Sequence, residues 1–220
     1  MSKLKQFFFT PVCISCGSFF CGPSLFCELC YQLGIRDRVV EASESPFGER
    51  HQYLLEWKNG DSEYISQLVY RMKSDNSVLA WNHYADLLAA RVHEAIDGRN
   101  FAAVVPIPSA NTKSVHAKLL AENLAEKLQL PMLDILQKKG GTDQKSLSAA
   151  ERAKVQNIEL KADAGEEFTD PASRHRKYIF VDDVLTTGES FKQAAAALSS
   201  ARNNLIATLF YRSKKGLGLH

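Results

Sequence analysis

The chain has 220 residues, of which 45% are apolar and 24% charged, and its formal net charge is +2. These values are ordinary for a globular protein and exclude gross disorder, while the charge is too small to indicate nucleic-acid binding by itself. No apolar run approaches the roughly 20 residues of a membrane-spanning helix, and Phe7-Phe8-Phe9, stopped by Pro11, is too short for a signal peptide. We therefore expect a cytoplasmic protein with one α/β domain and a small accessory unit.

All five cysteines lie between residues 13 and 30. Clustering in a chain without an export signal favours a metal over disulfides. Cys13-x-x-Cys16 and Cys27-x-x-Cys30 are two pairs separated by ten residues, and two such pairs can hold zinc tetrahedrally through four thiolates. Four thiolates leave no open position, so we expect a structural site. Cys21 is either a left-over thiol, which we favour, or a replacement for one of the four ligands.

The chain divides by pattern into three parts. Residues 1–35 form the zinc-binding module, residues 36–60 a connector with one hairpin strand, and residues 61–220 the main domain. In the connector, residues 51–57 alternate weakly between apolar and polar, and Asn59-Gly60 is a strong turn signal.

The main domain begins with two helices and continues as alternating strands and helices. Apolar residues at helical spacing predict helices over residues 62–73 and 78–96. In the second helix we expect an inward face made of Leu79, Ala80, His83, Leu87, Leu88, Val92 and Ile96.

Beyond residue 100, short apolar runs alternate with helical patterns, which predicts an α/β fold with a parallel sheet flanked by helices. The expected strands are 101–107, 131–136, 177–181 and 205–211, and the expected helices are 112–128 and 190–202. Residues 137–157, between the second and third of these strands, are polar, and we expect a long loop there.

The segment after the third of these strands carries the chemistry. Asp182 and Asp183 follow the strand directly, then come Thr186-Thr187-Gly188, and Ser190 begins the next helix. Ligands of open parallel sheets bind outside the carboxyl ends of the strands, and the N–H groups at a helix start favour an anion. The segment therefore predicts a phosphate in the loop and vicinal sugar hydroxyls on the carboxylates. The alternative, that Asp183 and Ser190 are only turn and cap residues, does not account for the whole pattern.

The string from Phe180 to Ser190 resembles the motif by which type I phosphoribosyltransferases bind phosphoribosyl pyrophosphate (PRPP). The resemblance implies that Asp182 and Asp183 hold the 2- and 3-hydroxyls of the ribose. It also implies Mg²⁺ bound together with PRPP, without a dedicated protein cage, because magnesium keeps most of its waters. The residues implied around the 5-phosphate are Val184, Leu185, Thr186, Thr187, Gly188, Glu189 and Ser190.

Further segments match a known family over nearly the full length of the chain. They are Met72-Lys73, Val105-Pro106-Ile107-Pro108, and the set Gln144, Leu147-Ser148, Glu151-Arg152 and Asn157. Together with the cysteine pairs and the acid-rich motif, they resemble the ComF family (ComFC/GntX-like proteins). The resemblance implies a four-cysteine zinc finger joined to a type I phosphoribosyltransferase-like domain, and a role in natural competence and DNA uptake.

The first loop departs from the family pattern. The family has an Arg-rich loop ending near Arg-Gly-Phe-Asn-Gln, whereas here Lys113-Ser114-Val115-His116 occupies that place. In transferases this loop grips pyrophosphate, and Lys113 can still meet a phosphate as a point charge. His116 is either a pyrophosphate contact or a solvated residue at a helix start.

Two functions follow. The first is a phosphoribosyltransferase in which Asp182 and Asp183 orient the ribose while Lys113, Lys138 and Arg152 neutralise the pyrophosphate. The loop over residues 137–157, which contains Gly140-Gly141 and basic residues such as Lys138 and Arg152, would close over the ligand, or it is a solvated charged loop. The second is a non-catalytic module that binds PRPP or single-stranded DNA and acts with a competence helicase. Nothing in the sequence identifies an acceptor substrate.

Overall fold

The computed structural model of the chain describes residues 12–19, 21–36, 47, 50–58, 63–75, 78–96, 100–109, 115–139, 157–165, 168, 175–199 and 204–213. The site residues Lys113 and Arg152, together with Gln144 and the turn at Asn59-Gly60, lie outside these ranges.

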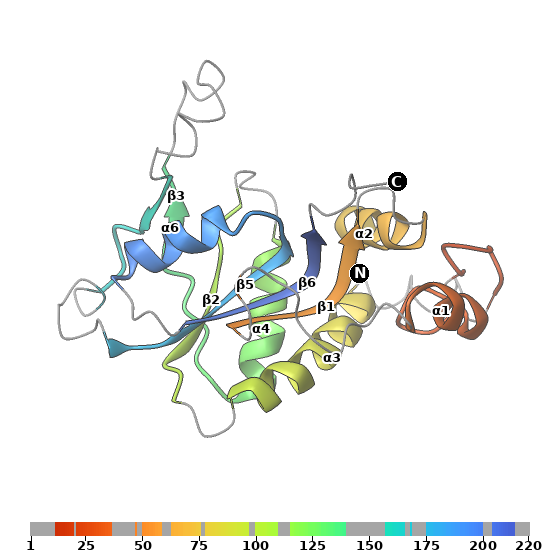
Figure 1. Ribbon diagram of the computed structural model, residues 1–220, viewed down its shortest axis with the longest axis horizontal. Coiled ribbons are helices and arrows are strands. Elements are labelled where there is room, and N and C mark those ends of the chain that lie inside the picture. Colours follow the sequence, from red (N-terminus) through yellow and green to blue (C-terminus); the bar gives the residue numbers. More distant parts are fainter. Residues whose placement is uncertain are drawn as a thin grey trace, which may run out of the picture.

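A four-stranded sheet forms the centre of the molecule, in the order β1-β6-β5-β2, and every neighbouring pair is parallel (Figure 1). The strands are β1 (His51–Lys58), β2 (Ala103–Pro106), β5 (Tyr178–Leu185) and β6 (Leu205–Ser213). The α/β architecture predicted from the alternating pattern is thereby confirmed.

β1 is the strand that we expected within the connector. It pairs in parallel with β6, from His51↔Ile206 to Lys58↔Ser213, and so forms an edge of the central sheet. Three consecutive residues, Tyr53, Leu54 and Leu55, are each no more than 2% exposed. A run buried on both faces is typical of a strand in a covered parallel sheet.

Helices cover both faces of the sheet (Figure 1). α3 (Val78–Ile96) and α4 (His116–Leu128) pack on one face, and α6 (Glu189–Ala197) packs on the other. α2 (Glu63–Asp75) follows β1, and the short α1 (Glu28–Gly34) lies beyond it. Within the described ranges, none of the helices has the length and hydrophobicity that crossing a bilayer requires.

A small antiparallel pair of strands, β3 (Leu136–Lys138) and β4 (Ile158–Leu160), lies on the α6 side. We expected a strand over residues 131–136, but among residues 131–135 only Met132 pairs, in an isolated parallel bridge with Val104. Pro131 has no N–H to donate, which limits pairing at the start of this run. The regular strand begins at Leu136, where the partner β4 becomes available.

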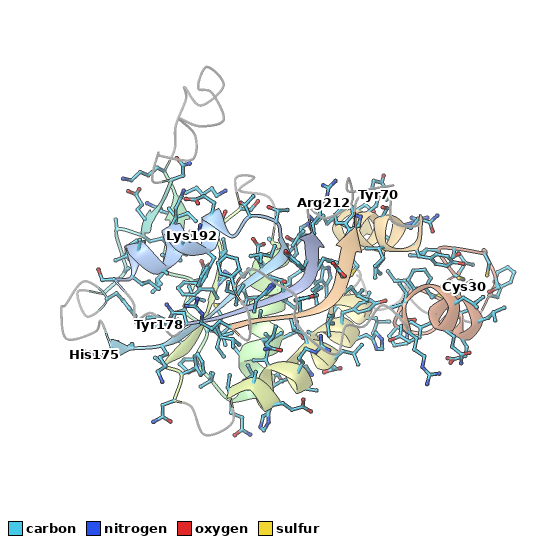
Figure 2. The ribbon with its side chains drawn as sticks, viewed as in Figure 1. Cys30, Tyr70, His175, Tyr178, Lys192 and Arg212 are labelled. Carbon is cyan, nitrogen blue, oxygen red and sulfur yellow. The ribbon has the colours of Figure 1, made fainter. Side chains whose placement is uncertain are left out.

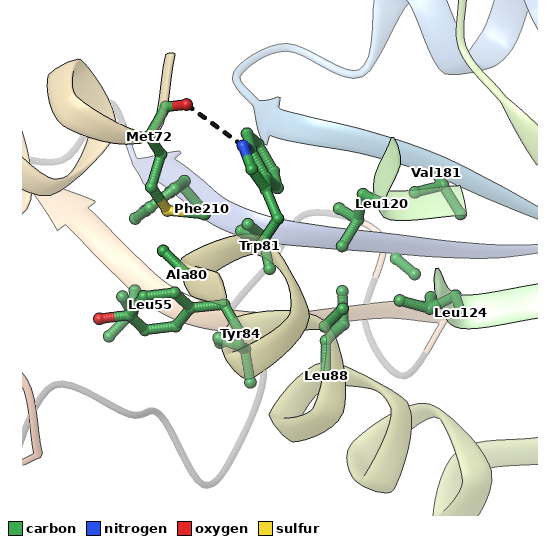
Figure 3. Packing of buried hydrophobic residues seen from close by; sticks show 14 of the residues in the cluster. Leu55, Met72, Ala80, Trp81, Tyr84, Leu88, Leu120, Leu124, Val181 and Phe210 are labelled. Carbon is green, nitrogen blue, oxygen red and sulfur yellow. Dashed lines mark hydrogen bonds between the residues drawn. The ribbon is translucent and has the colours of Figure 1, made fainter. Parts of the chain in front are cut away.

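The buried face of α3 is built on aromatic residues. Trp81, Tyr84 and Leu88 are each no more than 2% exposed and point toward the sheet (Figure 3). The prediction that Leu79 and Leu87 face inward is wrong, because they are 54% and 36% exposed. The large rings of Trp81 and Tyr84 occupy the centre of the interface, and this turns the two leucines to its flanks.

Trp81 also joins α3 to the end of α2. Its indole Nε1 donates a hydrogen bond to the backbone oxygen of Met72 at 3.2 Å, drawn as the dashed line in Figure 3. Met72 is 1% exposed, so the last turn of α2 is held against α3. This bond fixes the position of the next residue, Lys73.

His51 is a buried imidazole in the core of the sheet. It is 0% exposed, its Nε2 lies 2.8 Å from Thr208 Oγ1, and the rings of Tyr53 and Tyr211 lie 4.9 and 5.5 Å away. Burial lowers the pKa of His51 to about 3. The ring therefore stays neutral in the folded protein near pH 7.

This burial predicts a loss of stability in acid. The unfolded chain binds a proton on His51 near pH 6.5, whereas the folded chain does not until about pH 3, so the free energy of unfolding falls as the pH drops through this window. At pH 5 the loss due to His51 is about 2 kcal/mol.

Urea unfolding of the parent and of His51→Gln, at pH 7.5 and pH 5, measures this loss in the free energy of unfolding. The variant should lose about 2 kcal/mol less than the parent between the two pH values. Comparing how the free energy of unfolding changes with pH in the parent and in the variant cancels the contribution of all other titrating groups. His93→Gln, which changes an exposed histidine in the last turn of α3, is measured alongside as a variant that also lacks one imidazole. Equal slopes for parent and His51→Gln would contradict the prediction.

Candidate functional site

The four cysteines predicted as metal ligands come together. The sulfur atoms of Cys13, Cys16, Cys27 and Cys30 all lie within 4.8 Å of one another, and Cys16 Sγ is 3.7 Å from Cys27 Sγ. Tetrahedral zinc with Zn–S bonds of about 2.3 Å places its sulfurs about 3.8 Å apart, so the group fits one zinc ion. Cys21 is buried, and within the described ranges it is not part of this group.

Two local turns build the cluster. In the first, Gly17 donates its N–H to the oxygen of Cys13 at 2.9 Å, and the N–H of Cys13 donates to the oxygen of Ser18 at 2.9 Å. Gly17 has φ +72°, a left-handed conformation that glycine adopts without strain. The second pair lies at the start of α1, where Cys27 is the N-cap. Hydrogen bonding by Ser18, through its side chain first and its backbone second, lowers the pKa of Cys16 to about 6, whereas burial raises the pKa of Cys30 to about 12.

The cysteine module, meaning residues 12–19 and 21–36, packs against the main domain. Phe26 is 1% exposed and its ring centroid lies 6.0 Å from that of Tyr64 on α2. The Tyr84 hydroxyl on α3 donates a hydrogen bond to the backbone oxygen of Ser24 at 2.9 Å. At Gly34 an added Cβ would run into the Tyr64 ring. The module lies at one end of the molecule, with Cys30 far from His175 at the other end of the view (Figure 2).

The second candidate site is a polar pocket at the carboxyl ends of β2 and β5, with a volume of about 200 Å³. One wall comes from the end of β2 and the start of α4, with Pro108, Ser109, His116 and Ala117. The other parts are Asp182 and Asp183 on β5, Ser190 on α6, Lys73 at the end of α2 and Lys138 on β3. Segments from six elements therefore meet at the edge where ligands of open parallel sheets bind.

The acid pair, Asp182 and Asp183, lies on the part of β5 that extends past its last residue pair with β2. The last residue pair between β2 and β5 is Pro106↔Val181, but β5 stays paired with β6 as far as Leu185↔Tyr211. We expected the strand to end at Val181; it continues because β6 runs alongside. The carboxylates are thus held on a rigid strand beyond the end of β2.

The surroundings of the two carboxyls, Asp182 and Asp183, differ. Lys73 Nζ lies 2.7 Å from Asp183 Oδ2, and the backbone N–H of Asp183 donates to Asp182 Oδ1 at 2.8 Å. Burial of the carboxyl, and next the charge of Asp183, raise the pKa of Asp182 well above its usual value. Lys73 offsets negative charge of the pair at Asp183. The carboxyl oxygens can accept hydrogen bonds from hydroxyls, and the lysine reduces the repulsion of an anionic ligand.

Lys73 was noted in the sequence as part of a family match but was not assigned to the site. The feature of the sequence that could have pointed to Lys73 is its position at the end of a predicted helix. The structure brings it to the acid pair because the hydrogen bond from Trp81 to Met72 holds that turn of α2.

The predicted phosphate loop leads from β5 into α6. Gly188 is the N-cap of α6 with φ +73°, and the N–H of Glu189 donates to Thr187 Oγ1 at 3.4 Å. Thr186 and Thr187 are exposed. The Leu185 side chain is buried in one core of the protein, and the partly buried Val184 packs against the other.

Comparisons with known proteins give structural likenesses alone. No protein-family model matches the chain, and no curated protein matches it. Adenine phosphoribosyltransferase from Saccharomyces cerevisiae matches with 18% identity over 61% of this chain and 68% of that chain, at a TM-score of 0.40. A purine phosphoribosyltransferase from Pyrococcus horikoshii matches with 16% identity over 62% and 85%, at 0.37. A hypothetical protein from Neisseria gonorrhoeae with bound ppGpp matches with 10% identity over 63% and 86%, at 0.37. Likeness at this level assigns no activity, so the case for function rests on the pocket.

Proposed function

We propose that this protein binds PRPP in the pocket between β2, β5 and α6. The observation that carries the proposal is that the acid pair and Ser190, at the start of α6, line one pocket together with Lys73. The 5-phosphate would lie at the loop 186–190, on the backbone N–H groups that open α6. The ribose hydroxyls would donate hydrogen bonds to Asp182 and Asp183.

The remaining part of the ligand is the pyrophosphate. With the phosphate at the α6 side and the ribose on β5, it would extend toward the β2–α4 wall and Lys138. Mg²⁺ supplies charge neutralisation on the pyrophosphate when it is bound with PRPP, and we assign it no protein ligand because it keeps most of its waters. Lys113 and Arg152 stay proposed pyrophosphate contacts on sequence grounds alone.

The ComF-like assignment is also a proposal. It is supported by the meeting of three separate segments of the family resemblance at one pocket: Lys73, Pro108 and the acid-rich motif ending at Ser190. On this proposal the cysteine cluster holds a structural zinc ion, since its four thiolates leave no open position for a substrate.

Two activities fit such a pocket. A phosphoribosyltransferase would release pyrophosphate from PRPP in the presence of Mg²⁺ and one acceptor. The alternative is a non-catalytic module that binds PRPP, or single-stranded DNA alongside a competence helicase. A pyrophosphate-release assay against a panel of nucleobases separates the two when single-stranded DNA binding is titrated in parallel. DNA affinity that falls steeply with salt would favour the nucleic-acid function.

The direct test of PRPP binding is Asp183→Asn. The substitution keeps the shape but removes the charge that pairs with Lys73 and accepts a ribose hydroxyl. A hydrogen bond to a charged group contributes about 2 kcal/mol, so PRPP should bind roughly 30-fold more weakly. Inorganic phosphate should bind as in the parent, because it needs only the loop.

Isothermal titration with PRPP and Mg²⁺, and with phosphate, measures both effects. Asp163→Asn removes an exposed carboxylate beyond β4 and serves as the matched control with parent affinity. A parent protein that binds no PRPP in this titration would refute the proposed function.

A further inference from the structure

The helix α2 is in contact with both candidate sites, and it lies between α1 and the central sheet (Figure 1). At its start, the ring centroid of Tyr64 lies 6.0 Å from that of Phe26, and the same ring leaves no room for a Cβ on Gly34. At its end, Lys73 Nζ lies 2.7 Å from Asp183 Oδ2. Tyr64 and Lys73 are about two and a half turns apart in the helix, so their side chains leave it on opposite sides. One helix thus contacts the cysteine module and the acid pair.

The end of α2 that carries Lys73 is supported by α3, and α3 also contacts the cysteine module. Trp81 on α3 donates a hydrogen bond to the backbone oxygen of Met72. Tyr84 follows one turn later on the same side of α3, and its hydroxyl donates to the backbone oxygen of Ser24 at 2.9 Å. The two supports of Lys73, which are the start of α2 and the hydrogen bond from α3, therefore both lead to the cysteine module.

The body of α2 is packed tightly between these contacts. Ile65, Leu68 and Met72 on its inward face are each no more than 1% exposed. In a close-packed interior a change at one contact shifts whole elements, because no free space absorbs it. The Lys73 side chain differs, since it is 43% exposed and its flexible stem is placed by the backbone that carries it. A shift of α2 is therefore expected to move Lys73.

Lys73 is the group through which such a shift would reach a ligand. Its ammonium offsets negative charge at Asp183 and so reduces the repulsion of an anionic ligand. The attraction between the two charges falls as their separation grows. Displacing Lys73 would leave the acid pair facing an anionic ligand without its cation. This step rests on the proposed function, in which PRPP occupies the pocket.

We propose that α2 couples the cysteine module to the pocket: the module, folded around its metal, holds Lys73 on Asp183 and thereby raises the affinity for PRPP. Tyr64 and Tyr84 are positioning residues that act through Lys73. Coupling between two binding sites is reciprocal, so PRPP in the pocket should also tighten the binding of the metal. Loss of the metal would then weaken a ligand site to which the four cysteines contribute no side chain.

Isothermal titration with PRPP and Mg²⁺ tests the coupling in proteins that keep all four cysteines. Tyr64→Ala removes the contact with Phe26, and Tyr84→Phe removes only the hydrogen bond to Ser24. Each variant should bind PRPP about 5-fold more weakly than the parent, and inorganic phosphate as the parent does. In a Lys73→Met background neither change should weaken PRPP binding further, because the residue that transmits the effect is gone.

The matched control is Phe19→Ala, which removes a ring that is 68% exposed from the same module and should keep the parent affinity. Zinc analysis and thermal unfolding check that every variant is loaded and folded. If Tyr64→Ala does not fold, Tyr84→Phe carries the test, because it removes a single oxygen atom.

The reciprocal effect is measured by equilibrium competition for zinc against a zinc-selective chelator. Saturating PRPP with Mg²⁺ should tighten zinc binding about 5-fold in the parent and should not tighten it in Lys73→Met. Any zinc that PRPP itself binds is the same with both proteins, so the comparison cancels it.

The outcomes separate the coupling from the proposed function. If the parent binds no PRPP, the proposed function fails. If the parent binds PRPP while both tyrosine variants keep its affinity, or weaken binding equally in the Lys73→Met background, the coupling through Lys73 is overturned and PRPP binding stands. A zinc affinity that PRPP leaves unchanged in the parent would also overturn it.

Discussion

Gly188→Val is expected to abolish PRPP binding, weakening it at least 100-fold, because the loop geometry requires glycine twice over. Gly188 has φ +73°, a region that a β-branched residue reaches only with strain. An added Cβ would also run into the ring of Phe47. That ring cannot withdraw freely, since it packs edge-on against Phe191 with centroids 5.6 Å apart. The N-cap of α6 would have to move, and this would displace the N–H groups to which the proposed function assigns the 5-phosphate.

Isothermal titration with PRPP and with inorganic phosphate should show loss of both ligands, in contrast to Asp183→Asn, which spares phosphate. Gly22→Val is the matched control, because nothing lies within 4 Å of a Cβ at Gly22 and its φ is not in the left-handed region. The double variant Gly188→Ala with Phe47→Ala separates the two causes. Recovery of binding relative to Gly188→Ala alone would assign the effect to the collision, and no recovery would assign it to the backbone. Parent affinity in Gly188→Val would refute the assignment of the loop.

Cys27→Ser is expected to release the metal and unfold the cysteine module. Structural zinc contributes about 10–16 kcal/mol of apparent binding free energy in finger peptides, and a segment of this size cannot build an adequate core alone. The damage should spread to α2 and α3, because Tyr64 and Tyr84 would lose their contacts with Phe26 and Ser24. We expect the main domain, which contains the central sheet, to stay folded but to melt at a lower temperature than it does in the parent.

Metal analysis should find one zinc per chain in the parent and none in Cys27→Ser. Hydrogen exchange should become fast over residues 21–36 and stay slow in β5. Cys21→Ser, which changes a buried cysteine outside the cluster, should keep its zinc. Parent protein purified without chelator and free of zinc would contradict the prediction, as would full zinc retention in Cys27→Ser.

Much of the fold and both candidate sites could be predicted from local patterns in the sequence. The two cysteine pairs each span four residues, so the turns that bring their sulfurs together are short-range, and only the meeting of the two pairs was left to the fold. The acid pair, loop and helix start are likewise consecutive from Asp182 to Ser190. Such segments are readable because their partners lie close in the chain.

Interactions between distant segments were not readable in this way. β1 pairs with β6 across more than 150 positions, as His51 and Thr208 show with a separation of 157, and no local signal in residues 51–58 names that partner. The end of β5 depended on the length of β6, and the inward face of α3 depended on which side chains filled the space under the sheet. Leu79 and Leu87 have the right hydrophobicity and spacing, but packing of Trp81 and Tyr84 excluded them.

The amino-acid order alone specified the α/β class, the four clustered cysteines and the acid-rich loop after a buried strand, because each depends on hydrophobic period or on short spacing. The tertiary structure alone decided the composition of the pocket. Lys73 comes from α2, His116 from α4 and Lys138 from β3, and they meet Asp183 only because a parallel sheet brings the carboxyl ends of its strands to one edge. The charge balance of the acid pair was decided there too, since it depends on burial and on a lysine more than 100 positions away in the chain.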